Sequence, residues 1–235
     1  MTEIAVLGTG RMGASIAVGH AGVVITMLAD ADAVQAVLFG PDGAAPALPP
    51  GACLVEMSTN GPVAVRELAT RLPTTVDLVD APVAGSVAAA RAGQLRVLAG
   101  GADAAVDRAT PVLGALGTVR RCGDTGGGAA LKLVLNAALL VAVAGLADTL
   151  AVARAVGVDR ATALDALAAG PLGGVLTRAT ATDADFPLVL AAKDLDLARD
   201  ALVATPAPLL RAARSTLAAA DPTADIATLV ALENS

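Results

Sequence analysis

The first half of the chain alternates between two patterns of hydrophobic and polar positions. Short apolar runs rich in β-branched residues are typical of buried strands, and the segments between them repeat apolar residues at helical spacing. Strands are predicted at 3–8, 22–28, 52–58, 76–83, 94–101 and 118–123. Helices are predicted at 11–18, 31–39, 62–72 and 102–116. Strands that alternate with helices favour a mostly parallel sheet with helices on both of its faces.

The second half has a different pattern, because no strand signal returns after Gly126. Helices are predicted at 129–156, 159–169, 187–203 and 206–219. The change falls within GDTGGG (123–128), so we expect two domains. The predicted fold class is a doubly wound α/β domain over residues 1–124, followed by an all-α domain over residues 125–235.

The composition limits the possible partners. Hydrophobic residues make up 55% of the chain and charged residues 16%, against about 25% charged in a typical soluble domain. The net charge is −6 and there is no basic run, which argues against nucleic acid as a partner. The longest apolar run, 133–147, is interrupted by Asn136 and is shorter than the ~20 residues that span a bilayer. No membrane segment is therefore expected.

The reactive residues are few. Cys53 and Cys122 are the only cysteines and His20 is the only histidine, so neither a disulfide framework nor a metal site is predicted. The first residues, MTEIAVLG, carry an acid where a signal peptide would carry basic residues. A cytoplasmic protein is expected.

A glycine-rich turn, GTGRMG (8–13), lies between a predicted strand and a predicted helix. In this G-x-G-x-x-G context Gly8 permits the tight turn, Gly10 lets the backbone approach a pyrophosphate, and Gly13 lets helix and strand pack closely. The helix N-terminus would then face the phosphates. The alternative is a turn without a ligand. We predict a Rossmann-type dinucleotide site whose residues are Gly8, Thr9, Gly10, Arg11, Met12 and Gly13.

Lys132 and Asn136 stand four residues apart in GGGAALKLVLN (126–136) and thus on one face of an apolar helix. Burial disfavours the charged form of a lysine, so Lys132 could accept or donate a proton near neutral pH. Asn136 could hold a substrate oxygen or orient the lysine. The alternative is that Lys132 extends to solvent from the end of the helix.

Four stretches, GTGRMG (8–13), EMSTNGP (56–62), DAPVAGS (80–86) and GDTGGGAALKLVLN (123–136), resemble the β-hydroxyacid dehydrogenase family in order and surroundings. This family is related to 6-phosphogluconate dehydrogenase and to the imine reductases. FPLVLAAKDLDLA (186–198) resembles its later lysine-containing helix. The resemblance implies an NAD(P)-dependent oxidoreductase that acts on short 3-hydroxy acids at a cleft between its domains. It also implies a homodimer, which the extensive apolar surface of the helical domain favours.

The resemblance also assigns roles to single residues. Lys132 matches the catalytic lysine. The positions that match substrate-binding residues are Asn136, Gly85 and Ser86. The positions that match cofactor-contacting residues are Leu28, Thr59 and Lys193. The substrate loop of the family is usually SGG, whereas this chain has Ala84-Gly85-Ser86, so the substrate itself is left open.

Other interpretations of these residues stay open at this point. Ser58 and Thr59 could cap the helix that follows them. Lys193 could pair with Asp194 or Asp196. Asp30, 17 positions after Gly13, could instead read the ribose of a bound nucleotide.

The chain departs from the family after residue 20. ASIAVGH (14–20) passes almost directly into AGVVITMLADADAV (21–34), so a strand–helix–strand segment of ~30 residues is missing. That segment normally carries the residues that read the adenosine ribose, which leaves the choice between NAD and NADP open. Either the molecule lacks the segment, or the sequence omits pieces of the chain, as the low charge and the short segment 177–185 suggest.

Two other functions remain possible. One is an imine or ketone reductase on the same scaffold, although imine reductases usually replace the lysine found here at position 132. The other is a non-catalytic nucleotide-binding or dimerisation module, which a genuine loss of the ribose-reading segment would favour.

Overall fold

The computed structural model describes residues 3–7, 21–181 and 185–231. The chain divides into two compact units. The first contains the residues up to Gly85 together with Ala89–Lys132, and the second contains Ser86–Ala88 and the residues from Leu133 onward. The predicted boundary between residues 124 and 125 falls just before a long helix, whereas this division falls inside that helix.

A parallel sheet forms the centre of the first unit, as the alternating pattern predicts. Its strands are β1 (Ile4–Leu7), β2 (Val23–Thr26), β3 (Cys53–Glu56) and β4 (Asp77–Asp80), in that spatial order. A smaller sheet contains β5 (Val83–Ala84), β6 (Leu95–Ala99) and β7 (Gly117–Arg121). β5 is antiparallel to β6, and β6 is parallel to β7.

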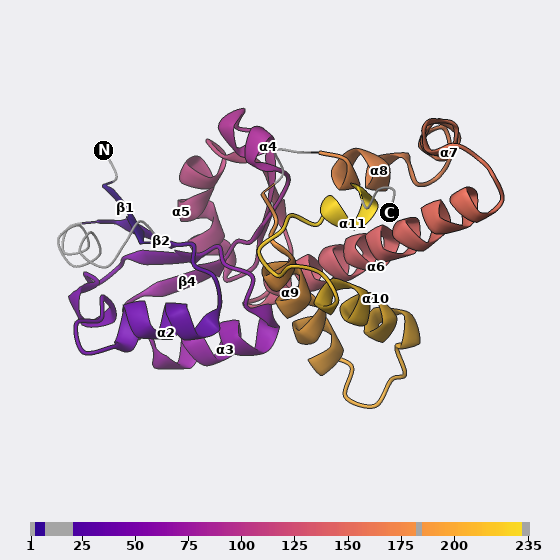
Figure 1. Cartoon of the computed structure of the whole chain (residues 1–235). Coiled ribbons are helices and arrows are strands. Elements are labelled where there is room, and N and C mark those ends of the chain that lie inside the picture. Colours follow the sequence, from indigo (N-terminus) through magenta and orange to yellow (C-terminus); the bar gives the residue numbers. More distant parts are fainter. Residues whose placement is uncertain (1–2, 8–20, 182–184, 232–235) are drawn as a thin grey trace. The chain divides into compact units, whose positions relative to one another are not determined.

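Helices cover both faces of the parallel sheet (Figure 1). One face packs against α2 (Ala31–Phe39) and α3 (Gly61–Arg71) through a core that includes Leu54 and Leu68. The other face packs against α5 (Asp103–Leu113) through a core that includes Val55. Because β2 and β3 are buried on both faces, their sequences are continuously apolar until the last residue. The doubly wound α/β fold is confirmed.

The first strand is exposed on one face. Within the described residues β1 pairs with β2 alone, and Ile4 and Val6 are each 50% exposed. Their register partners Val23 and Ile25 are buried against the α5 side of the sheet. In a complete doubly wound sheet the first strand lies in the interior. The predicted loss of a strand–helix–strand segment after residue 20 would leave β1 in this position.

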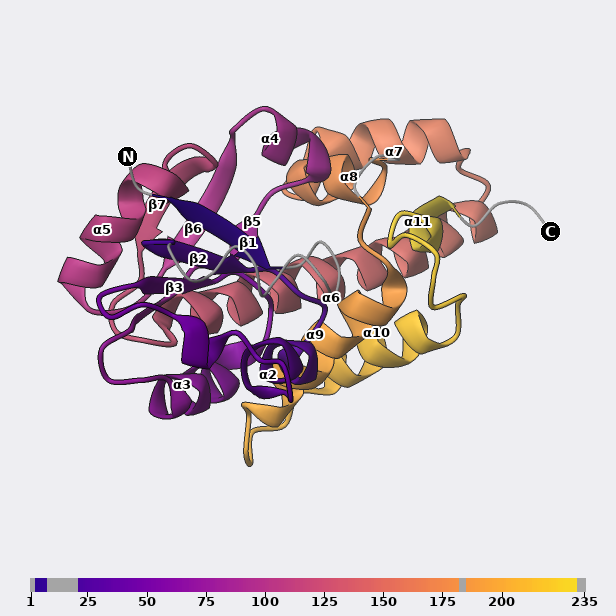
Figure 2. The same cartoon turned by 90° about the vertical axis from the view of Figure 1, so that its left-hand side faces the viewer.

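The second unit is helical, as predicted (Figure 2). Its longest helix is α6 (Gly127–Ala155), which begins in the first unit. The remaining helices are α7 (Arg160–Ala168), α8 (Gly173–Ala179), α9 (Leu188–Asp200), α10 (Pro208–Ala218) and α11 (Thr228–Ala231). α9 and α10 lie side by side and share a core with α6 that includes Leu140, Leu195 and Leu217.

Several short elements differ from the prediction. The strand expected over 76–83 ends at Asp80, and the chain turns into the antiparallel strand β5. Pro82 lies at this break and has no N–H to continue a ladder. The short helices α4 (Val87–Arg91), α8 and α11, and the 3-10 turn Ala45–Ala47, were not predicted. Their apolar spacing covers too few turns to be recognised in the sequence.

Helix α6 is longer than its uninterrupted apolar run. It spans 29 residues and is long and apolar enough to cross a membrane, by length and composition alone. Among the described residues, no other helix meets these two criteria. The argument that this region is too short to span a bilayer is therefore wrong for the whole helix. In the most apolar window of the helix, 39% is buried in the protein. The core helix of a protein that does not span a membrane can have the same length and apolar composition.

Candidate functional site

The carboxyl ends of the parallel strands lie along one edge of the sheet, where open α/β sheets bind their ligands. The glycine-rich turn Gly8–Gly13 follows β1 in sequence and lies outside the described residues. The predicted cofactor contacts Leu28 and Thr59 follow β2 and β3, and both are half-buried. An apolar side chain and a hydroxyl at the carboxyl ends of neighbouring parallel strands suit a dinucleotide. These residues therefore fit the cofactor that the sequence predicts.

A buried glutamate joins the two loops that carry these contacts. Glu56, the last residue of β3, is 0% exposed. Its carboxylate accepts hydrogen bonds from the Ser58 N–H (2.7 Å), the Asn60 amide (3.2 Å) and the Thr26 hydroxyl. The Ser58 hydroxyl in turn accepts the Leu28 N–H at 2.9 Å. The loops after β2 and β3 are thus held together.

The ionisation of Glu56 is shifted by its surroundings. Burial raises its pKa above the usual range, and the hydrogen bonds from Ser58 and Thr26 oppose this rise. Ser58 uses its hydroxyl for Leu28, and the N-cap residue of α3, Asn60, makes no side-chain capping bond. The interpretation of Ser58 as a helix cap is therefore not supported, and the cofactor role of Thr59 stays a prediction.

Asp30 lies at the start of α2, and its carboxylate accepts the Ala33 N–H at 2.8 Å. It is the N-cap of this helix, a role for which aspartate is among the preferred residues. This contact accounts for an acid at position 30 without a ribose.

A second buried carboxylate lies at the end of the neighbouring strand. Asp80, the last residue of β4, is the register partner of Glu56 and is also 0% exposed. Its side chain accepts the Gly126 N–H at 2.8 Å and the Ala129 N–H at 2.7 Å, at the N-terminus of α6. Burial raises the pKa of Asp80, and the N–H groups of Ala129 and Gly126 oppose this rise.

Lys132 and Asn136 lie on α6 one turn apart, as the sequence predicts. The Lys132 side chain is half-buried. Asn136 is only 5% exposed and donates its amide to Asp194 Oδ2 at 2.5 Å. Asp194, on α9, also pairs through Oδ1 with the Lys193 ammonium at 3.2 Å. Asn136 and Lys193, 57 positions apart in the sequence, are therefore joined through one buried carboxylate.

The predicted substrate loop has a constrained backbone. Gly85 has φ +148°, and a Cβ there would lie 2.7 Å from the Leu95 side chain. Ser86 is half-buried and directly precedes α4. The positive φ thus accounts for a glycine at position 85, and the substrate roles of Gly85 and Ser86 stay predictions.

Sequence reasoning did not assign a role to Glu56 or Asp80, and it considered Asp194 only as a partner of Lys193. A signal for the first two was present, because LVE and LVD each end a strand with an acid that follows two buried apolar residues. A carboxylate at the buried end of a strand needs hydrogen-bond donors, so it marks a place where other segments converge.

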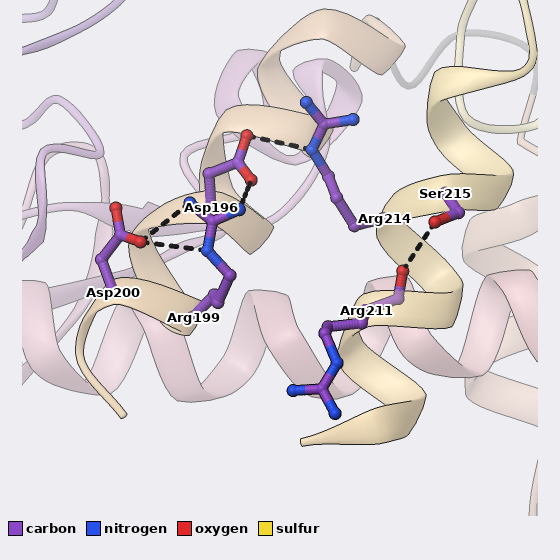
Figure 3. Close-up of polar contacts among 6 residues, drawn as sticks. All are labelled: Asp196, Arg199, Asp200, Arg211, Arg214 and Ser215. Carbon is purple, nitrogen blue, oxygen red and sulfur yellow. Dashed lines mark hydrogen bonds and ion pairs between the residues drawn. The ribbon is translucent and has the colours of Figure 1, made fainter. Parts of the chain in front are cut away.

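The helical unit also contains a groove. It has a volume of about 490 Å³ between α9 and α10, and of the predicted site residues only Lys193 lines it. Figure 3 shows the ion pairs at its margin, where Asp196 accepts from Arg199 and from Arg214, each at 2.9 Å. Asp200 accepts a further bond from Arg199 at 2.8 Å. These carboxylates and guanidinium groups therefore pair with one another along the groove.

Comparison with known proteins agrees with the fold and with the resemblance. Residues 14–126 match the family described as the NAD binding domain of 6-phosphogluconate dehydrogenase. An NAD-dependent L-serine dehydrogenase of Pseudomonas aeruginosa is 31% identical over 205 residues, which cover 80% of this chain and 69% of that protein.

Solved structures give the same result. A 3-hydroxyisobutyrate dehydrogenase of Mycobacterium tuberculosis, solved with L-serine, is 26% identical with a TM-score of 0.83 and 98% coverage of both chains. An imine reductase of Myxococcus stipitatus is 19% identical with a TM-score of 0.63, covering 98% of this chain and 99% of that one, and shows a shared fold alone.

The fold and these matches define a chain with an α/β unit similar to the NAD binding domain of 6-phosphogluconate dehydrogenase, followed by a helical unit. The chain belongs to the β-hydroxyacid dehydrogenase family. It spans about half the length of several curated relatives that it matches, from 43% to 52%.

Proposed function

We propose that the protein is an NAD(P)-dependent oxidoreductase that interconverts a short 3-hydroxy acid and its semialdehyde. The observation that carries the proposal is the arrangement at the start of α6. There Lys132 lies one turn before Asn136, and Asp194 holds the Asn136 amide. Family membership supports the reaction class.

The protein's own residues would manage the proton and the orientation of the substrate. A bound nicotinamide supplies the hydride acceptor or donor. In oxidation, the Lys132 amine takes the hydroxyl proton as the hydride leaves the same carbon, and in reduction the ammonium returns the proton to the carbonyl oxygen. Asn136, which Asp194 holds, would hydrogen-bond the same oxygen or the lysine.

The distribution of basic residues supports this role for Lys132. The chain contains only two lysines, Lys132 and Lys193, and its other fourteen basic residues are arginines. Arginine keeps its charge at any working pH, whereas a lysine amine can release its proton. A chain that otherwise uses arginine thus keeps lysine at the two positions that match functional lysines of the family.

A substrate panel tests the proposal. The purified chain would be assayed with NAD⁺ and NADP⁺ on 3-hydroxyisobutyrate and L-serine, and with NADPH and NADH on cyclic imines. We expect turnover of at least one hydroxy acid and none of the imines. Activity on imines alone would favour the imine reductase alternative. Absence of NADH and NADPH binding at millimolar concentrations would favour the non-catalytic module.

We also propose that the protein is a homodimer. The exposed face of α6 carries no charge between Val134 and Ala147, and Val152 further along is 60% exposed. Such a face favours burial against a second copy. Light scattering should give twice the 22.8 kDa mass of the chain, and Val152→Asp should shift it toward the monomer. The control Val203→Asp, at a side chain 99% exposed, should leave the mass unchanged; a monomeric wild type would contradict the proposal.

A further inference from the structure

Three segments of the first unit meet at Asp80. Its main chain forms an antiparallel bridge with Gly100, which directly follows β6. The bridge has two hydrogen bonds, from the Asp80 N–H to Gly100 O (3.0 Å) and from the Gly100 N–H to Asp80 O (2.8 Å). Its side chain accepts N–H groups from the start of α6. One residue therefore connects the parallel sheet, the smaller sheet and the long helix.

The Asp80 side chain provides hydrogen-bond acceptors for N–H groups at the start of α6. The first N–H groups of an α-helix have no partner within the helix, and its N-terminus carries a partial positive charge. Asp80 accepts two such groups, those of Gly126 and Ala129, although it lies 46 and 49 positions away in the sequence. Most helix caps are local residues, whereas this cap comes from the end of a strand. It ties the start of α6 to the sheet.

Lys132 lies shortly after the residues of α6 that are bonded to Asp80. It lies three residues after Ala129, which is about 4.5 Å along a helix axis at 1.5 Å per residue. Asp80, Ala129 and Lys132 belong to the same compact unit. A shift or rotation of the start of α6 against β4 would therefore move Lys132 by a similar amount.

We propose that Asp80 is a positioning residue for Lys132, because its carboxylate fixes the height and rotation of the first turn of α6. The proposal rests on the proposed acid–base role of Lys132 and extends it to a residue that does not touch the substrate. Glu56 holds the predicted cofactor loops in the same way, so the two neighbouring carboxylates organise different parts of the site.

Two variants of Asp80 provide a graded test. Asp80→Asn keeps one acceptor oxygen and Asp80→Ala keeps none. We expect kcat to fall about 10-fold in the first and about 100-fold in the second, since displacement of a catalytic group by about 1 Å can cost that much. The dissociation constant of the cofactor should stay near the wild-type value, because the side-chain hydrogen bonds of Asp80 described above go to the start of α6 and not to the loops after β2 and β3.

Asp77→Asn is the matched control. Asp77 is the first residue of the same strand, but its side chain is 45% exposed and pairs with Arg108. Surface ion pairs of this kind contribute little. This variant should keep the wild-type kcat, which would show that the effect belongs to the buried carboxylate.

A spectroscopic measurement reports on Lys132 without any turnover. Lysine labelled with ¹³C at Cε should give only two side-chain signals, because the chain has two lysines. Lys193→Arg would assign them. In Asp80→Asn we expect the Lys132 signal to move or broaden, while the Lys193 signal stays in place.

The outcomes separate this proposal from the proposed function. An Asp80→Asn variant with wild-type kcat and an unmoved Lys132 signal would overturn it. An Asp80→Asn variant that fails to fold would also overturn it, because Asp80 would then be a requirement of global stability. If Lys132→Ala kept its turnover, the proposed function would fail, and the lysine signals would still show whether Asp80 positions the helix.

Discussion

Replacement of Lys132 by alanine is expected to lower kcat by about 10²- to 10⁴-fold, the usual contribution of a positioned acid–base group. The dissociation constant of the cofactor should change little, because the predicted cofactor contacts lie after β2 and β3, in the glycine-rich turn and at Lys193 on α9. Steady-state kinetics with the best hydroxy acid of the panel, together with a fluorescence titration of NADH or NADPH, would measure both quantities.

Lys132→Arg separates charge from proton transfer. Arginine keeps the positive charge but cannot release a proton at a working pH. If Lys132 acts as an acid and base, the arginine variant should lose as much activity as the alanine variant. If Lys132 only attracts a substrate carboxylate, arginine should restore most of the activity.

Arg154→Ala is the control for these variants, since Arg154 is a basic and exposed residue in the last turn of the same helix. It should keep the wild-type kcat. Turnover by Lys132→Ala within a few-fold of the wild type would show that Lys132 is not the acid and base.

Much of the fold could be predicted because its signals are local. The apolar runs around Val24 and Leu54 and the helical spacing of α3 each appear within a short window, and each became the expected element. The Lys132–Asn136 pair was also found within one turn. These features depend on periodicity, which a single sequence displays.

The contacts that hold the candidate site together could not be predicted in this way. Asp80 meets α6 across 46 to 49 positions, and Asn136 meets Asp194 across 58. An acid at the end of an apolar strand indicates that donors are needed, but it does not say which segment supplies them. Such partners are set by tertiary packing, so only the structure reveals them.

The glycine run 126–128 is a further feature whose role depends on tertiary packing and could not be predicted from the sequence. In the sequence it indicates a domain boundary, and its residues could be taken for a flexible connection. In the structure Gly126 is buried with φ +91°, and Gly128 is packed between two strands. A Cβ at position 128 would lie 2.0 Å from the Leu98 carbonyl oxygen and 2.9 Å from that of Asp80. These are main-chain atoms, which cannot move aside as a flexible side chain can.

Gly128→Ala is therefore expected to lower the free energy of unfolding by about 2–3 kcal/mol, the upper part of the usual range for overpacking a tight site. Urea unfolding followed by circular dichroism would measure the change. The matched control is Gly174→Ala in α8, where no atom of the described residues, apart from the chain neighbours and the helix's own backbone, lies within 4 Å of an added Cβ. Alanine there should be neutral or stabilise the helix by up to about 1 kcal/mol.

The variants Gly128→Ala and Gly174→Ala also test why the start of α6 is glycine-rich. If close approach to β4 and β6 is the reason, the Gly128 variant loses stability and the Gly174 variant does not. Whatever fraction of Gly128→Ala stays folded should then also lose kcat, because its helix start can no longer reach Asp80. Equal stability of the two variants would mean that the first turn of α6 can move away from the sheet without cost. In that case neither the glycines nor Asp80 could fix the position of Lys132.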